Sequence, residues 1–177
     1  MQIWLDQVRE EPFNWEETKS VAPEALETPE LAALSPIHWK GQVAFADPGY
    51  YLRARLDYEQ TLSCDRCLKP IVEPVESDIE LLVLVERNPG AAGEHELDER
   101  DLGILYNKGE VLETDPIFLE QLQLNIPMKP LCRPDCKGLC PQCGADRNDA
   151  DCACEEQTAD PRWAALAALK SRLDESR

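Results

Sequence analysis

The sequence predicts an α+β fold, with a twisted antiparallel β-sheet or partial barrel, a helix packed against it, and a cysteine-rich C-terminal segment. Three observations support this class. Apolar residues alternate with polar ones in long runs between residues 38 and 85, a proline-initiated helix begins near residue 115, and six of the eight cysteines lie between residues 132 and 154. With 177 residues, the chain is long enough for one ordinary domain plus an appendage stapled by metal.

The first 36 residues carry the weakest structural signal. Residues 1–8 include the apolar side chains Ile3, Trp4, Leu5 and Val8 and fit a short edge strand. Residues 9–36 are acidic and contain four prolines, which favours a loop with a helical turn or two at residues 29–34.

The central part of the chain predicts three strands, in residues 38–45, 52–62 and 75–85. Apolar and polar side chains alternate in each, with the period of two that a half-buried strand requires. The two longer runs flank the turn Cys64-Asp65-Arg66-Cys67. We therefore expect an antiparallel hairpin with this turn at its tip.

Residues 87–101 are rich in acids and lack an apolar period, so they predict a flexible, solvated loop. Residues 102–112 predict one more short strand. Asp115 as N-cap and Pro116 in the first turn then open a helix, which Pro127 ends.

The start signal Asp-Pro recurs near the end of the chain and predicts a C-terminal helix over residues 160–173. We divide the chain into an α+β domain, residues 1–128, and a cysteine segment with this helix, residues 129–177. The second part is expected to be tied to the Cys64/Cys67 turn.

The cysteines are spaced as metal ligands. The downstream six follow the pattern Cys132-x3-Cys136-x3-Cys140-x2-Cys143-x8-Cys152-x-Cys154, and the upstream pair is Cys64-x2-Cys67. Eight thiols make two sets of four, and sulfur-only tetrahedral sites suit Zn2+. We therefore expect two bound zinc ions, with an iron–sulfur cluster on the same ligands as the alternative.

Two ways of pairing the cysteines remain open at this stage. The shortest loops place Cys140, Cys143, Cys152 and Cys154 in one site, and Cys64, Cys67, Cys132 and Cys136 in the other. The geometry of a zinc ribbon would instead join the two CxxC turns, Cys64/Cys67 with Cys140/Cys143. Either pairing joins the hairpin tip to the downstream cluster.

The sequence contains no constellation typical of an enzyme. It has no phosphate-binding glycine loop, no serine–histidine–acid set and no paired acids in an apolar setting. A closed four-thiolate site leaves no position for a reacting water, so the sites are expected to be structural. A thiol redox sensor that releases zinc on oxidation is the rival interpretation.

Net charge restricts the choice of partners. The chain carries −17, a field that repels phosphates and attracts basic proteins. The cysteine segment alone is locally basic, with Lys129, Arg133, Lys137 and Arg147 against two aspartates, and these four are the candidate RNA contacts. No signal peptide and no apolar run of spanning length is recognisable, so we expect a cytoplasmic protein without membrane contact.

From about residue 35 to the end, the motifs resemble the YceD family, also called DUF177, described as large ribosomal RNA subunit accumulation proteins. The resemblance rests on CDRCL at 64–68, PLCRPDCKGLCPQCG at 130–144 and the trailing Cys152-x-Cys154 before Asp160-Pro161-Arg162. The matching positions are the eight cysteines with Arg66, Pro130, Gly138, Leu139, Pro141, Gly144, Asp160, Pro161 and Arg162. The resemblance implies a non-enzymatic role in processing or accumulating large-subunit rRNA within pre-ribosomal particles, with plant relatives acting in chloroplasts. An acidic, chaperone-like binder of a basic ribosomal protein is the alternative.

Overall fold

The structure is a computed structural model that describes residues 1–86, 103–149 and 152–154. The chain forms two compact units, residues 1–136 and residues 137–177. The division falls directly after Cys136, so each unit contains four of the eight cysteines. The loop predicted for residues 87–101 and the helix predicted for residues 160–173 lie outside the described residues.

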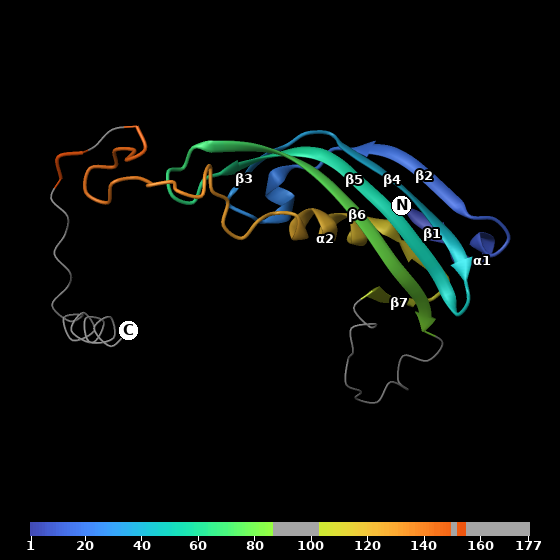
Figure 1. The fold of residues 1–177 in the computed structure, drawn as a ribbon. Helices are drawn as coiled ribbons and strands as arrows, with labels where there is room; N and C mark the ends of the chain where they lie inside the picture. The colour runs from blue at the N-terminus through green and yellow to red at the C-terminus, as the bar shows by residue number, and fades with distance from the viewer. Residues whose placement is uncertain (87–102, 150–151, 155–177) are drawn as a thin grey trace, which may run out of the picture. The chain divides into compact units, whose positions relative to one another are not determined.

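A six-stranded sheet is the main element of the first unit (Figure 1). Its strands follow the order β2-β4-β5-β6-β7, and β3 pairs with the far end of β5. The strands are β2 (Phe13–Lys19), β3 (Leu31–Leu34), β4 (Ile37–Ala46), β5 (Gly49–Ser63), β6 (Pro70–Glu86) and β7 (Ile104–Lys108). The sheet is open, because β2 and β7 end the path without pairing with each other. The predicted α+β class is confirmed, and the barrel alternative is not.

The sheet is antiparallel up to β6, as predicted, but β7 pairs with β6 in parallel. The expectation of a purely antiparallel sheet was therefore wrong at this edge. Parallel neighbours require a connection of a dozen or more residues. The segment between Glu86 and Ile104 has that length, and β7 pairs with the last five residues of β6, from Leu82↔Ile104 to Glu86↔Lys108.

A small ribbon and the helices α1 and α2 lie outside this sheet in the first unit. Strand β1 (Gln2–Trp4) pairs antiparallel with β8 (Val111–Glu113), and α2 (Thr114–Leu124) follows β8 directly. The edge strand predicted for residues 1–8 is shorter than expected, because α1 (Leu5–Val8) is a helical turn whose two apolar residues are buried.

The core lies between the inner face of the curved sheet and α2 (Figure 1). Leu52, Leu56 and Val83 are buried as the alternation predicted, and Trp39 is fully buried. The Trp39 ring lies 5.6 Å from the ring of Phe118 on α2. Aromatic contacts at this spacing contribute about 0.5–1.5 kcal/mol beyond the area they bury.

Residues 9–36, predicted as a loop, contain β2, the short helix η1 (Pro23–Leu26) and β3. Strand β2 has one buried side chain, Trp15, so its sequence carries little apolar alternation. Residues 29–34 were expected to turn helically, but Leu31 pairs with Leu62 in β5. In both places pairing with a neighbouring strand outweighs local propensity.

Helix α2 confirms the helix predicted after residue 115, but its first residue is Thr114 and no side chain caps it. The carboxylate of Asp115 instead accepts a hydrogen bond from Lys19 Nζ at 2.5 Å. The bond lowers the pKa of the Asp115 carboxyl and joins β2 to α2. The Lys19 ammonium also lies over the Phe118 ring, 4.9 Å from its centroid.

Gly41 on β4 provides the space in which Trp15 of β2 packs. The two residues are paired across the strands, and a Cβ atom at position 41 would lie 2.3 Å from the indole of Trp15 and 2.7 Å from the carbonyl oxygen of Arg53. The indole therefore covers the glycine, which lacks a side chain of its own to pack on the sheet.

Gly41→Ala is expected to destabilise the first unit by about 1–3 kcal/mol, the cost typical of overpacking, because both the indole and a β5 backbone atom must move. Urea unfolding followed by circular dichroism measures the change. Gly103→Ala is the matched control, since a Cβ there meets nothing within 4 Å. Equal stability of the two variants would contradict this account of Trp15 packing.

Candidate metal centres

The predicted hairpin tip is present, with the Cys64–Cys67 turn joining β5 to β6. The amide of Leu68 donates to the carbonyl oxygen of Cys64 at 2.9 Å, and the amide of Cys64 donates to the carbonyl oxygen of Lys69 at 2.9 Å. Leu68 has φ +59°, in the left-handed region that non-glycine residues rarely adopt. This closed turn directs both thiols to one side.

The chain after α2 returns to this tip. Backbone contacts fix the approach, because the amide of Asp65 donates to the carbonyl oxygen of Pro130 at 3.0 Å and the amide of Cys132 donates to Cys64 Sγ at 3.4 Å. Pro127 and Pro130 follow the end of α2 and stiffen the segment that leads to Cys132. The sulfur atoms of Cys132 and Cys136 therefore meet those of the tip.

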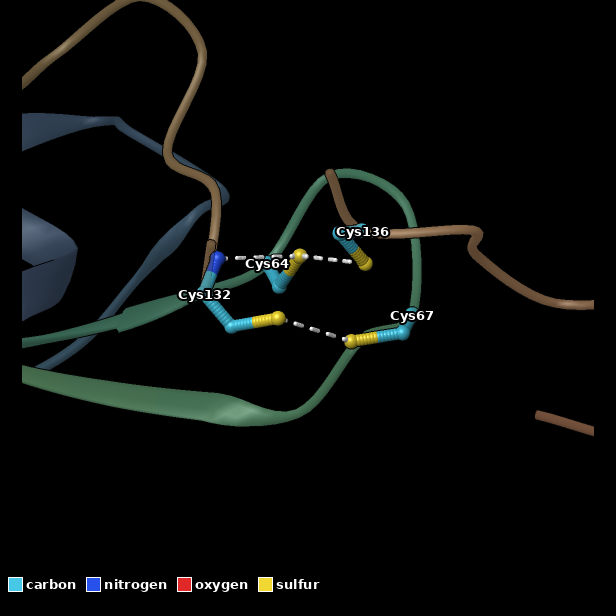
Figure 2. A group of neighbouring side chains, drawn as sticks. All are labelled: Cys64, Cys67, Cys132 and Cys136. Carbon is cyan, nitrogen blue, oxygen red and sulfur yellow. Dashed lines mark hydrogen bonds between the residues drawn. The ribbon is translucent and has the colours of Figure 1, made fainter. Parts of the chain in front are cut away.

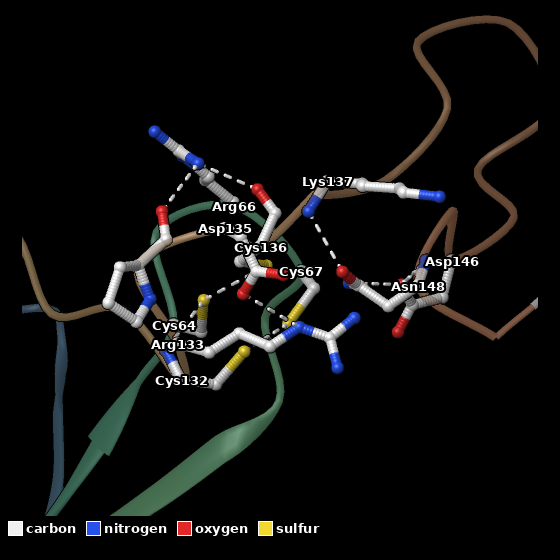
Figure 3. A network of polar contacts seen from close by, with 11 residues as sticks. Cys64, Arg66, Cys67, Cys132, Arg133, Asp135, Cys136, Lys137, Asp146 and Asn148 are labelled. Carbon is white, nitrogen blue, oxygen red and sulfur yellow. Dashed lines mark hydrogen bonds and ion pairs between the residues drawn. The ribbon is translucent and has the colours of Figure 1, made fainter.

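Arg66 fastens the returning segment from within the CxxC turn (Figure 3). Its guanidinium donates to the carbonyl oxygen of Cys136 at 2.7 Å and to that of Pro134 at 3.5 Å. Sequence reasoning singled out Arg66 only as a motif position, because nothing in the local sequence shows that its partners lie about 70 residues away.

The first four-cysteine site consists of Cys64, Cys67, Cys132 and Cys136 (Figure 2). Its sulfur atoms all lie within 4.8 Å of one another. Cys64 Sγ lies 3.9 Å from Cys136 Sγ, and Cys67 Sγ lies 3.6 Å from Cys132 Sγ. A tetrahedral ion with metal–sulfur bonds of about 2.3 Å requires sulfur separations of about 3.8 Å. Both of these separations lie close to that value, so the four thiols could hold such an ion.

The second site lies in the second unit and consists of Cys140, Cys143, Cys152 and Cys154, again with all sulfurs within 4.8 Å. Its CxxC turn repeats the first one, since the amide of Gly144 donates to the carbonyl oxygen of Cys140 at 2.9 Å. Gly144 has φ +73°, the conformation that Leu68 adopts in the other turn. The glycine therefore provides the left-handed conformation that closes this turn.

A short hairpin supports the second CxxC turn. Leu139 and Asp146 form an antiparallel bridge, the amide of Cys140 donates to Ala145 at 2.8 Å and that of Arg147 to Gly138 at 3.0 Å. Asn148 adds a side-chain contact, because its Oδ1 accepts from the amide of Lys137 at 2.8 Å (Figure 3). The second site is thus built from residues close together in sequence.

The structure distinguishes the two pairings that the sequence left open. Each CxxC turn meets the cysteines of its own unit, which corresponds to the pairing by shortest loops. The zinc-ribbon pairing of the two CxxC turns is not what the structure shows.

In each site one cysteine has a lowered pKa and therefore loses its proton at a lower pH than an ordinary thiol does. Burial raises the pKa of Cys64, but backbone amides of Cys132, Cys67 and Arg66 outweigh this and lower it to about 6. Amides of Cys143 and Gln142 likewise lower the pKa of Cys140 to about 6.

One thiol in each site shows the opposite shift. Desolvation and the thiols of Cys136 and Cys67 raise the pKa of Cys132 to about 12. The pKa of Cys154 rises to about 12 as well, mainly through its contact with the Cys143 thiol. A second negative charge is therefore costly until a cation shares the site, which is the behaviour of a metal-binding thiol set.

The four candidate RNA contacts are exposed and divide between the units. Lys129 and Arg133 belong to the first unit, and Lys137 and Arg147 to the second. The guanidinium of Arg133 lies 3.5 Å from the carboxylate of Asp135, so part of its charge is already offset. Their role in RNA binding stays a prediction.

No helix in the described part of the chain is long and apolar enough to cross a bilayer.

An α+β protein with two four-cysteine sites capable of holding metal ions is the class that these features define. Residues 52–170 match the family described as large ribosomal RNA subunit accumulation protein YceD. The chain belongs to the YceD family, as the motifs indicated.

Bacterial proteins match part or nearly all of the chain. Uncharacterized proteins of Mycobacterium tuberculosis and Mycobacterium bovis are 34% identical over 103 residues, which is 58% of this chain and 47% of theirs. The chain thus matches about half the length of these relatives. The uncharacterized protein YlbN of Bacillus subtilis is 25% identical over 173 residues, 97% of this chain and 96% of its own. No solved structure matches the chain.

We expect the wild-type chain to hold about two metal ions, and Cys64→Ser and Cys140→Ser to hold one fewer each, because each variant leaves the other thiol set intact. Elemental analysis of protein purified under reducing conditions counts the ions. Ser63→Ala is the matched control and should keep both. Loss of both ions in Cys140→Ser would contradict two separate sites.

Gly144→Ala is expected to weaken the second site by about 1 kcal/mol, since an alanine at φ +73° is strained although nothing crowds its Cβ. Leu68→Gly relieves the same strain in the first turn, so it should leave the first site at least as stable apart from the entropy of the added glycine. Competition with a chromogenic chelator measures both affinities. If Leu68→Gly lost more affinity relative to the wild-type first site than Gly144→Ala lost relative to the wild-type second site, the strain argument would be wrong.

Proposed function

We propose that this protein is a non-enzymatic factor that supports the accumulation of large-subunit rRNA during ribosome assembly. The observation that supports the proposal most is the family match over residues 52–170. The matched region contains the cysteines of both four-cysteine sites. The cytoplasm, where thiols stay reduced, is the compartment that suits eight free cysteines.

We infer that the ions are zinc and that their role is structural. In both sites the four sulfurs lie within 4.8 Å of one another, and two separations in the first site, 3.6 and 3.9 Å, are those of a tetrahedral Zn2+ site. Four thiolates leave no open coordination position for a substrate. When bound, the ion supplies charge that allows four neighbouring thiolates to coexist. The chain itself then holds its loops in place through the backbone amides of the two CxxC turns and through Arg66.

The first site would contribute to stability through loop closure. It joins Cys64 to Cys132, 68 residues apart, and therefore connects the hairpin tip to the segment after α2. Closing so long a loop by a bound ion couples the folding of the tip to that of the sheet. A binding surface at this end of the first unit would thus be ordered only in the loaded protein.

Two routes to the rRNA remain in the proposal. Lys129, Arg133, Lys137 and Arg147 could contact phosphates directly, as the locally basic segment suggests. The net charge of −17 instead supports an indirect route, in which the acidic surface holds a basic ribosomal protein. The second route is the one we favour, because the charge acts over the whole chain.

Deletion of the gene is expected to lower the ratio of large- to small-subunit rRNA about twofold or more, because the large-subunit rRNA fails to accumulate. Quantification of both rRNAs and gradient profiles of ribosomal particles measure this. Wild-type protein and Ser63→Ala should restore the ratio, and Cys64→Ser should restore it poorly. An unchanged ratio in the deletion strain would refute the proposed function.

A further inference from the structure

A groove of about 560 Å3 in the first unit is used neither by the cysteine sites nor by the candidate RNA contacts. It lies between β7, the β1–β8 ribbon and α2. Its lining includes Trp4, Leu105, Tyr106, Val111, Ile117 and Glu120. The volume falls within the range of ordinary ligand pockets.

Two aromatic side chains border the groove and are strongly exposed, Trp4 at 53% and Tyr106 at 50%. The floor beside them is apolar and rigid, since Leu112 and Ile117 are buried in the core. Large aromatic rings cost free energy in water, so an exposed pair over an apolar floor is typical of a binding surface.

The groove follows the free edge of the sheet. Four consecutive residues of β7, 105–108, line it, which places the strand backbone and not only one face along the groove. Within the described residues β7 pairs with β6 alone, so no described strand covers its other edge. Asn107 holds the following turn through bonds from its Nδ2 to the carbonyl oxygens of Gly109 and Val111. The edge is therefore preformed for an added strand.

Charge on the walls selects the class of ligand. The lining residues include two glutamates, Glu113 and Glu120, and one cation, Lys108, and the chain as a whole carries −17. An exposed indole such as Trp4 attracts ammonium and guanidinium groups over its face. The groove therefore favours cationic side chains and repels phosphates.

We propose that this groove binds an extended, lysine- or arginine-bearing segment of a basic protein, added as a strand to the edge of β7. Alternate side chains of the segment would pack on the apolar floor, and its cations would lie between the wall glutamates and the Trp4 ring. The proposal rests on the proposed function for the setting in which such a partner is met, and on the groove for the chemistry of the partner.

The test is a titration of the full-length chain with a blocked ten-residue peptide of alternating lysine and valine. We expect saturable binding that weakens about tenfold in Trp4→Ala and in Glu120→Lys, and several-fold between 50 and 300 mM salt. Glu120 lies exposed on α2, so the lysine variant should fold normally. Phe13→Ala is the control, because Phe13 is an exposed aromatic residue on β2, at the opposite edge of the sheet.

Four outcomes would overturn the proposal. These are equal binding of a glutamate–valine peptide, an equal loss in Phe13→Ala, competition by a ten-residue uridine oligonucleotide, and a change of oligomeric state in Trp4→Ala with unchanged peptide affinity. The last would assign the edge to a second copy of the chain. Failure of the proposed function would show separately, as an unchanged rRNA ratio in the deletion strain.

Discussion

Four sulfur atoms from two distant stretches must share one small volume at the tip of the β5–β6 hairpin, and much of the first unit is arranged to meet that constraint. The long hairpin carries Cys64 and Cys67 beyond the core, while α2 and its terminating prolines return Cys132 and Cys136 to the same place. Amides stabilise one thiolate, and the neighbouring sulfurs penalise the next. A divalent cation resolves that conflict, which explains why backbone contacts and Arg66 converge on so small a region.

Features determined by local chemistry were predictable from the sequence. Strands β4, β5 and β6 alternate strongly, Pro116 lies in the first turn of α2 and Pro127 shortly after its end, and a glycine follows the second CxxC turn. The remaining features depend on contacts that no local pattern encodes. Strand β2 buries only Trp15 and owes its conformation to pairing with β4, and the parallel direction of β7 follows from a crossover whose path no residue pattern reveals. The cysteine spacing likewise identified the ligands, but only the fold showed which turn meets which pair.

The two sites have the same chemistry but different dependence on the rest of the chain. Both use a CxxC turn closed by an amide-to-carbonyl bond of 2.9 Å and a following residue with positive φ. The second site is local, within the span from Cys140 to Cys154, so a few turns suffice to assemble it. The first site instead needs the β5–β6 hairpin and the segment after α2 to be folded together before its four sulfurs meet. Loss of metal should therefore have unequal structural effects, small around the second site and wide around the first.

The separation of 68 residues between Cys64 and Cys132 also has a consequence during synthesis. At typical translation speeds of about 5–20 residues per second, the upstream thiol pair waits roughly 3 to 14 s for its downstream partners. During that interval only two of the four ligands of the first site exist, and these two thiols can bind another metal ion or be oxidised. The yield of correctly assembled protein should consequently depend on how well the cell controls its pool of soft metals while the nascent chain is still on the ribosome.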